Sequence, residues 1–225
     1  MGSLAQDLEI RAKKTVKAIN WRKHKSIIEN YWVEIDRYWK NKDVFGFKIF
    51  QDAMATNGMV GQKIVVDLAK KGSMNYKIVK QLMKKGAQLV KTEDPDLLKE
   101  EYFLTKELVK RKSLLAGLFA FLRYKWRKGG LLAKRDSYIA KRIDESLQEG
   151  EIGVCFLGAR HQVLPILSKD IMVITLKNPE KVKEYYQKFT TQKWEGKVND
   201  LSRYLTAPIR VHLGKKYDHS TSSGS

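Results

Sequence analysis

The sequence contains one cysteine, no glycine-rich phosphate loop and no apolar core of signal-peptide length in residues 1–20. A single cysteine excludes a disulfide framework and a zinc site built from several cysteines, and it favours a reducing compartment. Neither the Gly-x-Gly-x-x-Gly pattern nor the Walker pattern is present. We therefore expect a cytoplasmic protein without a nucleotide-binding loop of either kind.

Long apolar runs are also absent. The longest covers residues 114–122, whereas a helix needs about 20 apolar residues to cross a membrane. Basic and aromatic residues follow at 123–128. The run is therefore either a buried helix that emerges into water or a helix lying in a membrane interface. The pair Gly129-Gly130 predicts a helix stop, which favours the buried helix.

Positive charge is abundant. The 225 residues include 44 Lys+Arg and 25 Asp+Glu, a net charge of +19, and 43% are hydrophobic. So much apolar material argues against disorder. Residues 103–142 hold 12 basic and 2 acidic residues, a net charge of +10. This excess predicts an anionic partner, which could be an acidic small molecule, an acidic protein, nucleic acid or an anionic membrane surface.

Apolar runs and helical periodicity alternate along the chain, which is typical of a layered α/β domain. The expected strands cover 44–50, 87–91, 152–157, 171–176 and 209–213. The expected helices cover 4–42, 60–71, 75–85, 95–112, 135–149 and 180–189, with a short helical turn at 163–167. Thr92 or Asp94 is expected to cap the helix that begins near Pro95. Cys155 lies in an apolar run and is predicted to be buried.

This pattern predicts an α/β fold with a mainly parallel sheet flanked by helices and a helical N-terminal segment. We divide the chain into that segment at 1–42, a single α/β domain at 43–215 and a flexible tail at 216–225. The tail consists mostly of serine, threonine and glycine after its first residues. The oligomeric state is left open.

Polar side chains follow three of the predicted strands. Asp52 follows the first strand, Glu93 and Asp94 follow the second, and His161 follows the third. Ligands of a parallel sheet bind beyond the carboxyl ends of its strands. Asp52, Glu93 and His161 could therefore bind a divalent metal or perform general acid–base chemistry. The alternative is local: Asp94 caps a helix, Asp52 begins a turn and His161 makes a nearby hydrogen bond.

Two motifs resemble a known family. Arg135-Asp136 is expected at a helix start, and Gly158-Ala159-Arg160-His161 follows the next strand. This combination is similar to the C-terminal signature of the TraB/ChaN/erythromycin-esterase-like group, over about residues 130–176. The group includes esterase-like hydrolases, a haem- or iron-associated lipoprotein and metal-dependent peptidases. The resemblance implies an α/β fold with a polar cleft formed by His, Glu or Asp, and Arg.

The sequence departs from the family at its first strand. The family carries an earlier Gly-x-x-His there, whereas this chain has Asp52 at that strand's end. By order along the chain, the family's downstream Glu corresponds to Glu93. The resemblance, over residues 130–176, covers about a fifth of the chain.

The candidate site residues have distinct expected roles. His161 is a general base or metal ligand, and Asp52 and Glu93 hold a metal or a water, or orient the histidine. Arg135 binds an anionic group of the substrate, since its planar fork suits carboxylates and phosphates. Arg160 and Asp136 are expected to join the substrate site, unless Asp136 caps the helix.

We therefore expect an enzyme-like cleft, with a hydrolase acting on an anionic substrate as the leading hypothesis. The alternative is a nucleic-acid-binding protein, including a nuclease, that uses the basic region 103–142. The residues expected to contact nucleic acid are Arg123, Lys125, Trp126, Arg127 and Lys128. A third hypothesis is peripheral contact of residues 114–128 with an anionic membrane.

Overall fold

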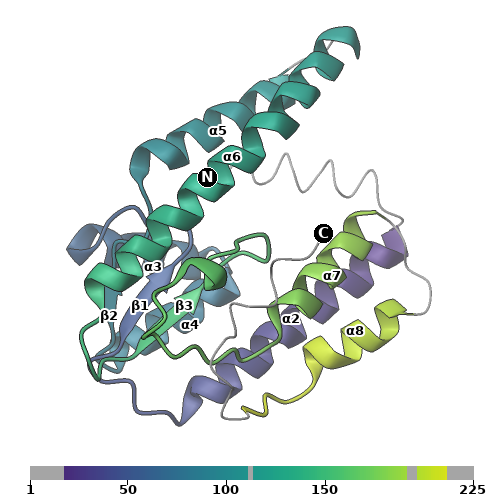
Figure 1. Ribbon diagram of the computed structural model, residues 1–225. Helices are drawn as coiled ribbons and strands as arrows, with labels where there is room; N and C mark the ends of the chain where they lie inside the picture. Colours follow the sequence, from purple (N-terminus) through teal and green to yellow (C-terminus); the bar gives the residue numbers. More distant parts are fainter. Residues whose placement is uncertain (1–17, 111–113, 192–196, 212–225) are drawn as a thin grey trace. The chain divides into compact units, whose positions relative to one another are not determined.

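The computed structural model describes residues 18–110, 114–191 and 197–211, which form two compact units (Figure 1). The sheet unit covers 43–173, and the helical unit joins 18–42 to 174–211. This division differs from the predicted one, because residues 174–211 group with the N-terminal helical segment and not with the α/β domain. The predicted tail at 216–225 lies outside the described residues.

A three-stranded parallel sheet forms the centre of the sheet unit. Its strands are β1 (Lys48–Gln51), β2 (Gln88–Val90) and β3 (Gly153–Phe156), in the order β2-β1-β3. Both pairings are parallel, with Phe50 opposite Val90 on one side and Cys155 on the other. Helices flank the sheet, as the alternation predicted. They are α3 (Gly58–Lys70), α4 (Met74–Lys84), α5 (Pro95–Lys110) and α6 (Leu114–Ser146), with the 3-10 turn η1 (Leu164–Ile166).

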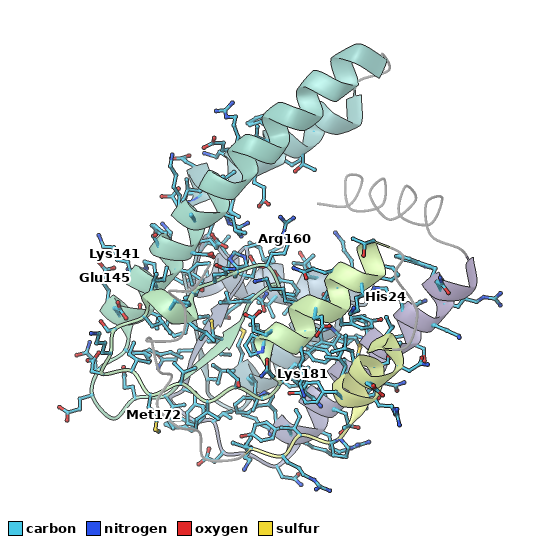
Figure 2. All side chains as sticks on the ribbon, turned by 45° about the vertical axis from the view of Figure 1, so that its right-hand side comes forward. His24, Lys141, Glu145, Arg160, Met172 and Lys181 are labelled. Carbon is cyan, nitrogen blue, oxygen red and sulfur yellow. The ribbon has the colours of Figure 1, made fainter. Side chains whose placement is uncertain are left out.

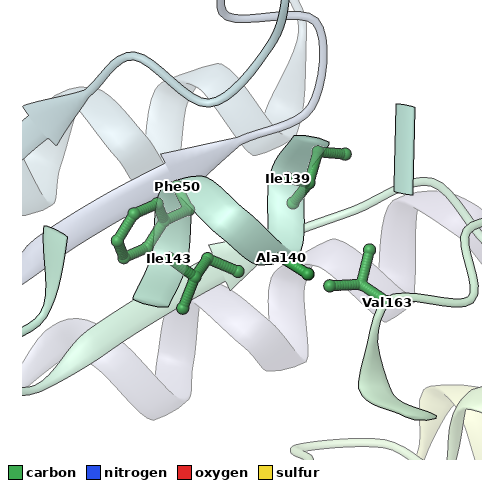
Figure 3. Close-up of a cluster of buried hydrophobic side chains, with 5 residues drawn as sticks. All are labelled: Phe50, Ile139, Ala140, Ile143 and Val163. Atoms are coloured by element: carbon green, nitrogen blue, oxygen red, sulfur yellow. The ribbon is translucent and has the colours of Figure 1, made fainter. Parts of the chain in front are cut away.

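The last turns of α6 pack on one face of this sheet. Figure 3 shows Phe50 of β1 beside Ile139, Ala140 and Ile143 of α6, with Val163 from the loop after β3. Successive side chains of a strand point to opposite faces, so the equally buried Ile49 lies on the other face. Burial of β1 on both faces explains the adjacent apolar residues Ile49 and Phe50 at its centre.

A single helix, α6, covers both the apolar run 114–122 and most of the helix predicted at 135–149. α6 runs unbroken from Leu114 to Ser146, so the predicted stop at Gly129-Gly130 is wrong. A glycine ends a helix when it adopts a positive φ, as Gly86 does after α4 with φ 94°. Gly129 and Gly130 keep a helical conformation instead. Arg135 and Asp136 therefore lie inside a long helix and not at its start.

Three further expectations about the strands fail. Residues 171–176 do not form a strand, and Met172 in that segment is 64% exposed. Residues 209–211 are irregular as well, while 212 and 213 lie outside the described residues. Strand propensity is strongly context-dependent, and neither residues 171–176 nor the described residues 209–211 gain a hydrogen-bonding neighbour in the sheet. Cys155, expected in the core, is exposed on the edge strand β3.

The helical unit contains α2 (Ala18–Lys40), α7 (Pro179–Thr190) and α8 (Lys197–Thr206). Tyr185 of α7 is fully enclosed with Val198, Leu201 and Leu205 of α8, and α2 adds Ile27 to this core. The predicted N-terminal helix is thus confirmed over 18–40, while 1–17 lie outside the described residues. Helix α8 was not predicted. Among the described helices, none combines the length and apolar composition needed to cross a membrane.

Candidate functional site

The four residues proposed for chemistry meet at one edge of the sheet. Asp52, Glu93 and His161 follow β1, β2 and β3, whose carboxyl ends share that edge because the strands are parallel. Arg135 reaches the same place from α6. Its Nη2 lies 2.8 Å from Asp52 Oδ1, and its Nε lies 3.1 Å from Glu93 Oε2. The structure therefore bears out the convergence of these side chains.

Arg135 is the centre of the cluster. Only 5% of this residue is exposed, and its guanidinium also donates from Nη2 to Glu93 Oε1. A third carboxylate comes from Glu101 of α5, whose Oε2 lies 2.5 Å from Arg135 Nη1. Three carboxylates thus surround one buried guanidinium, which offsets the large cost of burying its charge.

Sequence reasoning missed Glu101, although a signal was present. Glu101 lies four residues after Leu97 and three before Leu104, so all three share one face of α5. Leu104 is buried, which identifies that face as the inner one. A carboxylate on the inner face of an amphipathic helix needs a buried partner, and Arg135 is that partner.

His161 lies between two carboxylates. Its Nδ1 is 2.5 Å from Asp136 Oδ1, and its Nε2 is 3.4 Å from Asp52 Oδ2. The second oxygen of Asp136 accepts from the Gln162 backbone N–H at 2.9 Å. Asp136 therefore orients His161 and does not cap a helix. Of the two predicted caps of α5, Thr92 and Asp94, it is Asp94 that caps the helix. Its Oδ1 accepts from the backbone N–H of Asp96 at 2.7 Å.

Local backbone features position Asp52. Ala53 adopts φ 61°, an uncommon left-handed conformation that turns the chain directly after β1. The N–H of Gly158 donates to Asp52 Oδ2 at 3.2 Å. A Cβ atom on Gly158 would lie 3.0 Å from that same oxygen. A side chain at 158 would therefore crowd the Asp52 carboxylate, which gives a physical reason for the first residue of Gly158-Ala159-Arg160-His161.

The cluster shifts the pKa values of its members in different directions. Burial by itself would lower the pKa of His161, but the hydrogen bonds that its ring donates to Asp136 and Asp52 outweigh burial and raise that pKa to about 9. Burial also works against ionisation of Asp52, yet the neighbouring His161 and Arg135 lower its pKa to about 2. Burial raises the pKa of Glu93 despite its contact with Arg135. His161 is therefore an imidazolium at neutral pH.

Three of these residues could hold a metal ion. Asp52, Glu93 and His161 each offer one ligand atom, and these atoms lie within 4.8 Å of one another. Two carboxylate oxygens and one imidazole nitrogen suit a divalent transition metal. Binding would require the loss of the His161 proton and a shift of Arg135 from the carboxylates, so metal and Arg135 would compete for the same oxygens.

Of the remaining predicted residues, the two whose side chains the structure describes are exposed. Arg160 is exposed and has no ion-pair partner among the residues described (Figure 2). Arg127 is exposed on α6, and its Nη2 lies 3.4 Å from Glu100 Oε1. The side chains of the other proposed nucleic-acid contacts, Arg123, Lys125, Trp126 and Lys128, lie outside the described part of the chain, although their backbone belongs to α6.

Comparisons of the chain with protein families, with curated proteins and with solved structures find no match. The resemblance to the TraB/ChaN/erythromycin-esterase-like group stays a prediction, and it rests on Arg135, Asp136 and the Gly158–His161 motif.

Proposed function

We propose that this chain is a hydrolase whose reaction centre is the cluster at the carboxyl edge of the sheet, and that its substrate carries a negatively charged group. The observation that supports this most directly is the placement of His161 between Asp136 and Asp52. A histidine held at Nδ1 presents Nε2 in a defined direction, here toward Asp52 Oδ2, so proton transfer to a substrate would require Nε2 to exchange Asp52 for the leaving group.

His161 would act as the proton donor. Its pKa of about 9 keeps it protonated at neutral pH, which favours an acid over the general base expected from sequence. In hydrolysis, the oxygen of water bonds to the reacting atom, and the bond to the leaving group breaks. The Nε2 proton would pass to the leaving group, and the proton released by the water would restore the imidazolium.

Arg135 and Arg160 would attract the anionic group of the substrate. The cluster itself contains four carboxylates, from Asp52, Glu93, Glu101 and Asp136, against two cationic groups. Proton uptake by Glu93, whose pKa is raised, would reduce this acidic excess. Alternatively, a divalent metal held by Asp52, Glu93 and His161 would offset it and supply a Lewis acid.

A turnover screen tests the proposal. The full chain is assayed on p-nitrophenyl carboxylate and phosphate esters, with and without Mg²⁺, Mn²⁺ or Zn²⁺. We expect turnover by the parent protein and loss of at least about a hundredfold in His161→Gln. Glu145→Gln is the control, because Glu145 lies on the outer side of α6 beside Lys141 (Figure 2). No turnover of any ester, or equal turnover in both variants, would contradict the proposal.

Nucleic-acid binding is the second candidate. It is supported by the net charge of +10 over residues 103–142 and by the single helix α6, on which the basic run 123–128 is continuous. Anisotropy of labelled single-stranded DNA and RNA would be followed as salt rises. We expect a steep loss of affinity with salt, and weaker binding when Arg123, Lys125, Arg127 and Lys128 are replaced by Ala. Absence of binding at low salt would exclude this function.

A further inference from the structure

The three carboxylates around Arg135 are held to very different degrees. Glu93 has a fully buried side chain, and its Oε1 also accepts from the N–H of Ala53 at 3.4 Å. Asp52 has a second donor in the N–H of Gly158. The Glu101 carboxylate has Arg135 as its one donor among the described residues, and its side chain is 35% exposed. Glu101 is thus the partner that can leave most easily.

The geometry of the guanidinium points in the same direction. Nε and Nη2 of Arg135 bind the inner carboxylates, while Nη1 faces Glu101. Departure of Glu101 would leave that nitrogen without an acceptor at the accessible side of the cluster. A guanidinium with a free N–H attracts carboxylate or phosphate oxygens, which form charge-assisted hydrogen bonds with it.

We propose that Glu101 occupies an anion-binding position on Arg135, and that a carboxylate or phosphate group of the substrate replaces it. The inference rests on the proposed function, because it names the group that the same site recognises. Exchange of one anion for another leaves Arg135 paired throughout, so the exchange avoids the cost of an unpaired buried charge.

Glu101→Gln removes the competing charge and should open the position. Inorganic phosphate and acetate are titrated separately into the full chain, and binding is followed by calorimetry. We expect Glu101→Gln to bind at least one of these anions about tenfold more tightly than the parent protein. The comparison of phosphate with acetate identifies which group the position prefers.

Glu100→Gln is the matched control. Glu100 is the preceding residue of α5, its side chain is 38% exposed, and it pairs with Arg127 at the surface. Both variants change the net charge of this basic protein by the same amount, so non-specific anion binding rises equally in both. A gain confined to Glu101→Gln supports the proposal, and equal affinities in the two variants overturn it.

A double variant tests whether Arg135 is the receptor. Arg135→Lys combined with Glu101→Gln should lose the gain in anion affinity, with circular dichroism used to establish that it folds. If the double variant does not fold, the comparison between Glu101→Gln and Glu100→Gln still decides the outcome. Anion binding is measured without turnover. Tighter anion binding in Glu101→Gln without any esterase activity would therefore support this subsite and reject the hydrolase. Esterase activity without tighter anion binding would support the hydrolase and reject the subsite.

Discussion

His161 in the sheet unit and His24 in the helical unit are both largely enclosed, yet their pKa values move in opposite directions. The ring of His24 stacks on Phe189 with centroids 3.7 Å apart, and its Nδ1 lies 2.9 Å from the Tyr185 hydroxyl. Burial lowers the pKa of His24 to about 4. His161 has two carboxylates instead, and its pKa rises to about 9. Burial therefore removes the charge of a histidine unless the fold brings an acid to it.

The same difference separates the two cores. Aromatic and aliphatic side chains fill the core around Tyr185 in the helical unit, although Glu34 and Lys177 of that unit are also buried. The core around Tyr185 is therefore stabilised by apolar burial and packing. The sheet unit buries Arg135, Asp136 and Glu93 beside its apolar cluster. Buried charges are stable only when each has its partners. Such a cluster is costly to maintain, and perturbed groups of this kind are concentrated at functional sites.

The largest expected effect comes from Arg135→Met, which leaves three carboxylates without their shared cation. We expect a loss of about 3–5 kcal/mol in the free energy of unfolding, measured by urea denaturation. Arg142→Met on the same helix is the control, because Arg142 pairs with the more exposed Glu145 at 2.8 Å. That variant should lose about 1 kcal/mol or less. Equal losses would show that the cluster is no more strongly coupled than a surface pair.

The pH dependence of stability should separate the two histidines. The folded-state pKa of His161 is raised, so its contribution is present below about 6.5 and is lost as pH rises through about 9. The folded-state pKa of His24 is lowered, so its contribution is present above about 6.5 and is lost as pH falls through about 4. Urea unfolding of His161→Gln and His24→Gln across this range tests both windows. If NMR showed the rings of both histidines titrating near pH 6.5, their pKa values would not differ as proposed.

Asp136→Asn tests whether the carboxylate causes the shift of His161. Without that negative charge, the pKa of His161 should fall from about 9 towards the ordinary histidine value, and the protein should lose about 1–3 kcal/mol. Ring NMR measures the first effect, and urea denaturation measures the second. Asp144→Asn, two turns further along α6, is the control, since within the described part of the chain Asp144 accepts one long hydrogen bond, from the Ser168 N–H at 3.4 Å. If the pKa of His161 were unchanged in Asp136→Asn, Asp52 and not Asp136 would be the cause of the raised pKa.

The smallest effect is expected from Tyr185→Phe in the helical unit. This change removes the hydroxyl that faces His24 while keeping the buried ring. We expect a loss of about 1 kcal/mol, and Tyr102→Phe at an exposed position serves as the control. The pKa of His24 should stay low, because burial causes its shift. A return of that pKa to the ordinary range would show that the hydroxyl, and not burial, excludes the proton.

Prediction from the sequence succeeded where a signal is local. The apolar runs that became β1, β2 and β3 and the order of the intervening helices are readable from periodicity alone. Parallel strands place their carboxyl ends together, so the sequence alone groups Asp52, Glu93 and His161 at one edge of the sheet. Arg135 was included through the family resemblance and not through its position in the helix.

Prediction failed where distant contacts decide the structure. Residues 171–176 have the composition of a strand, but a strand needs a neighbour to satisfy its backbone groups. Gly129 and Gly130 resemble a helix stop, but the flanking turns keep them helical at a cost of about 1 kcal/mol each. Cys155 is apolar in pattern but lies on the open edge strand.

The scarcity of cysteine and of long apolar runs, the strongly basic charge and the α/β alternation are properties of the sequence by itself. Tertiary structure alone decided the partners of the buried charges. Glu101 of α5 pairs with Arg135 of α6, and Asp136 pairs with His161, which lies 25 residues further along the chain. Local periodicity specifies which face of an element turns inward, whereas the pairing of two charges depends on where distant elements come together. For this reason the sequence indicated the candidate residues, and only the fold showed that they form one ion-paired cluster.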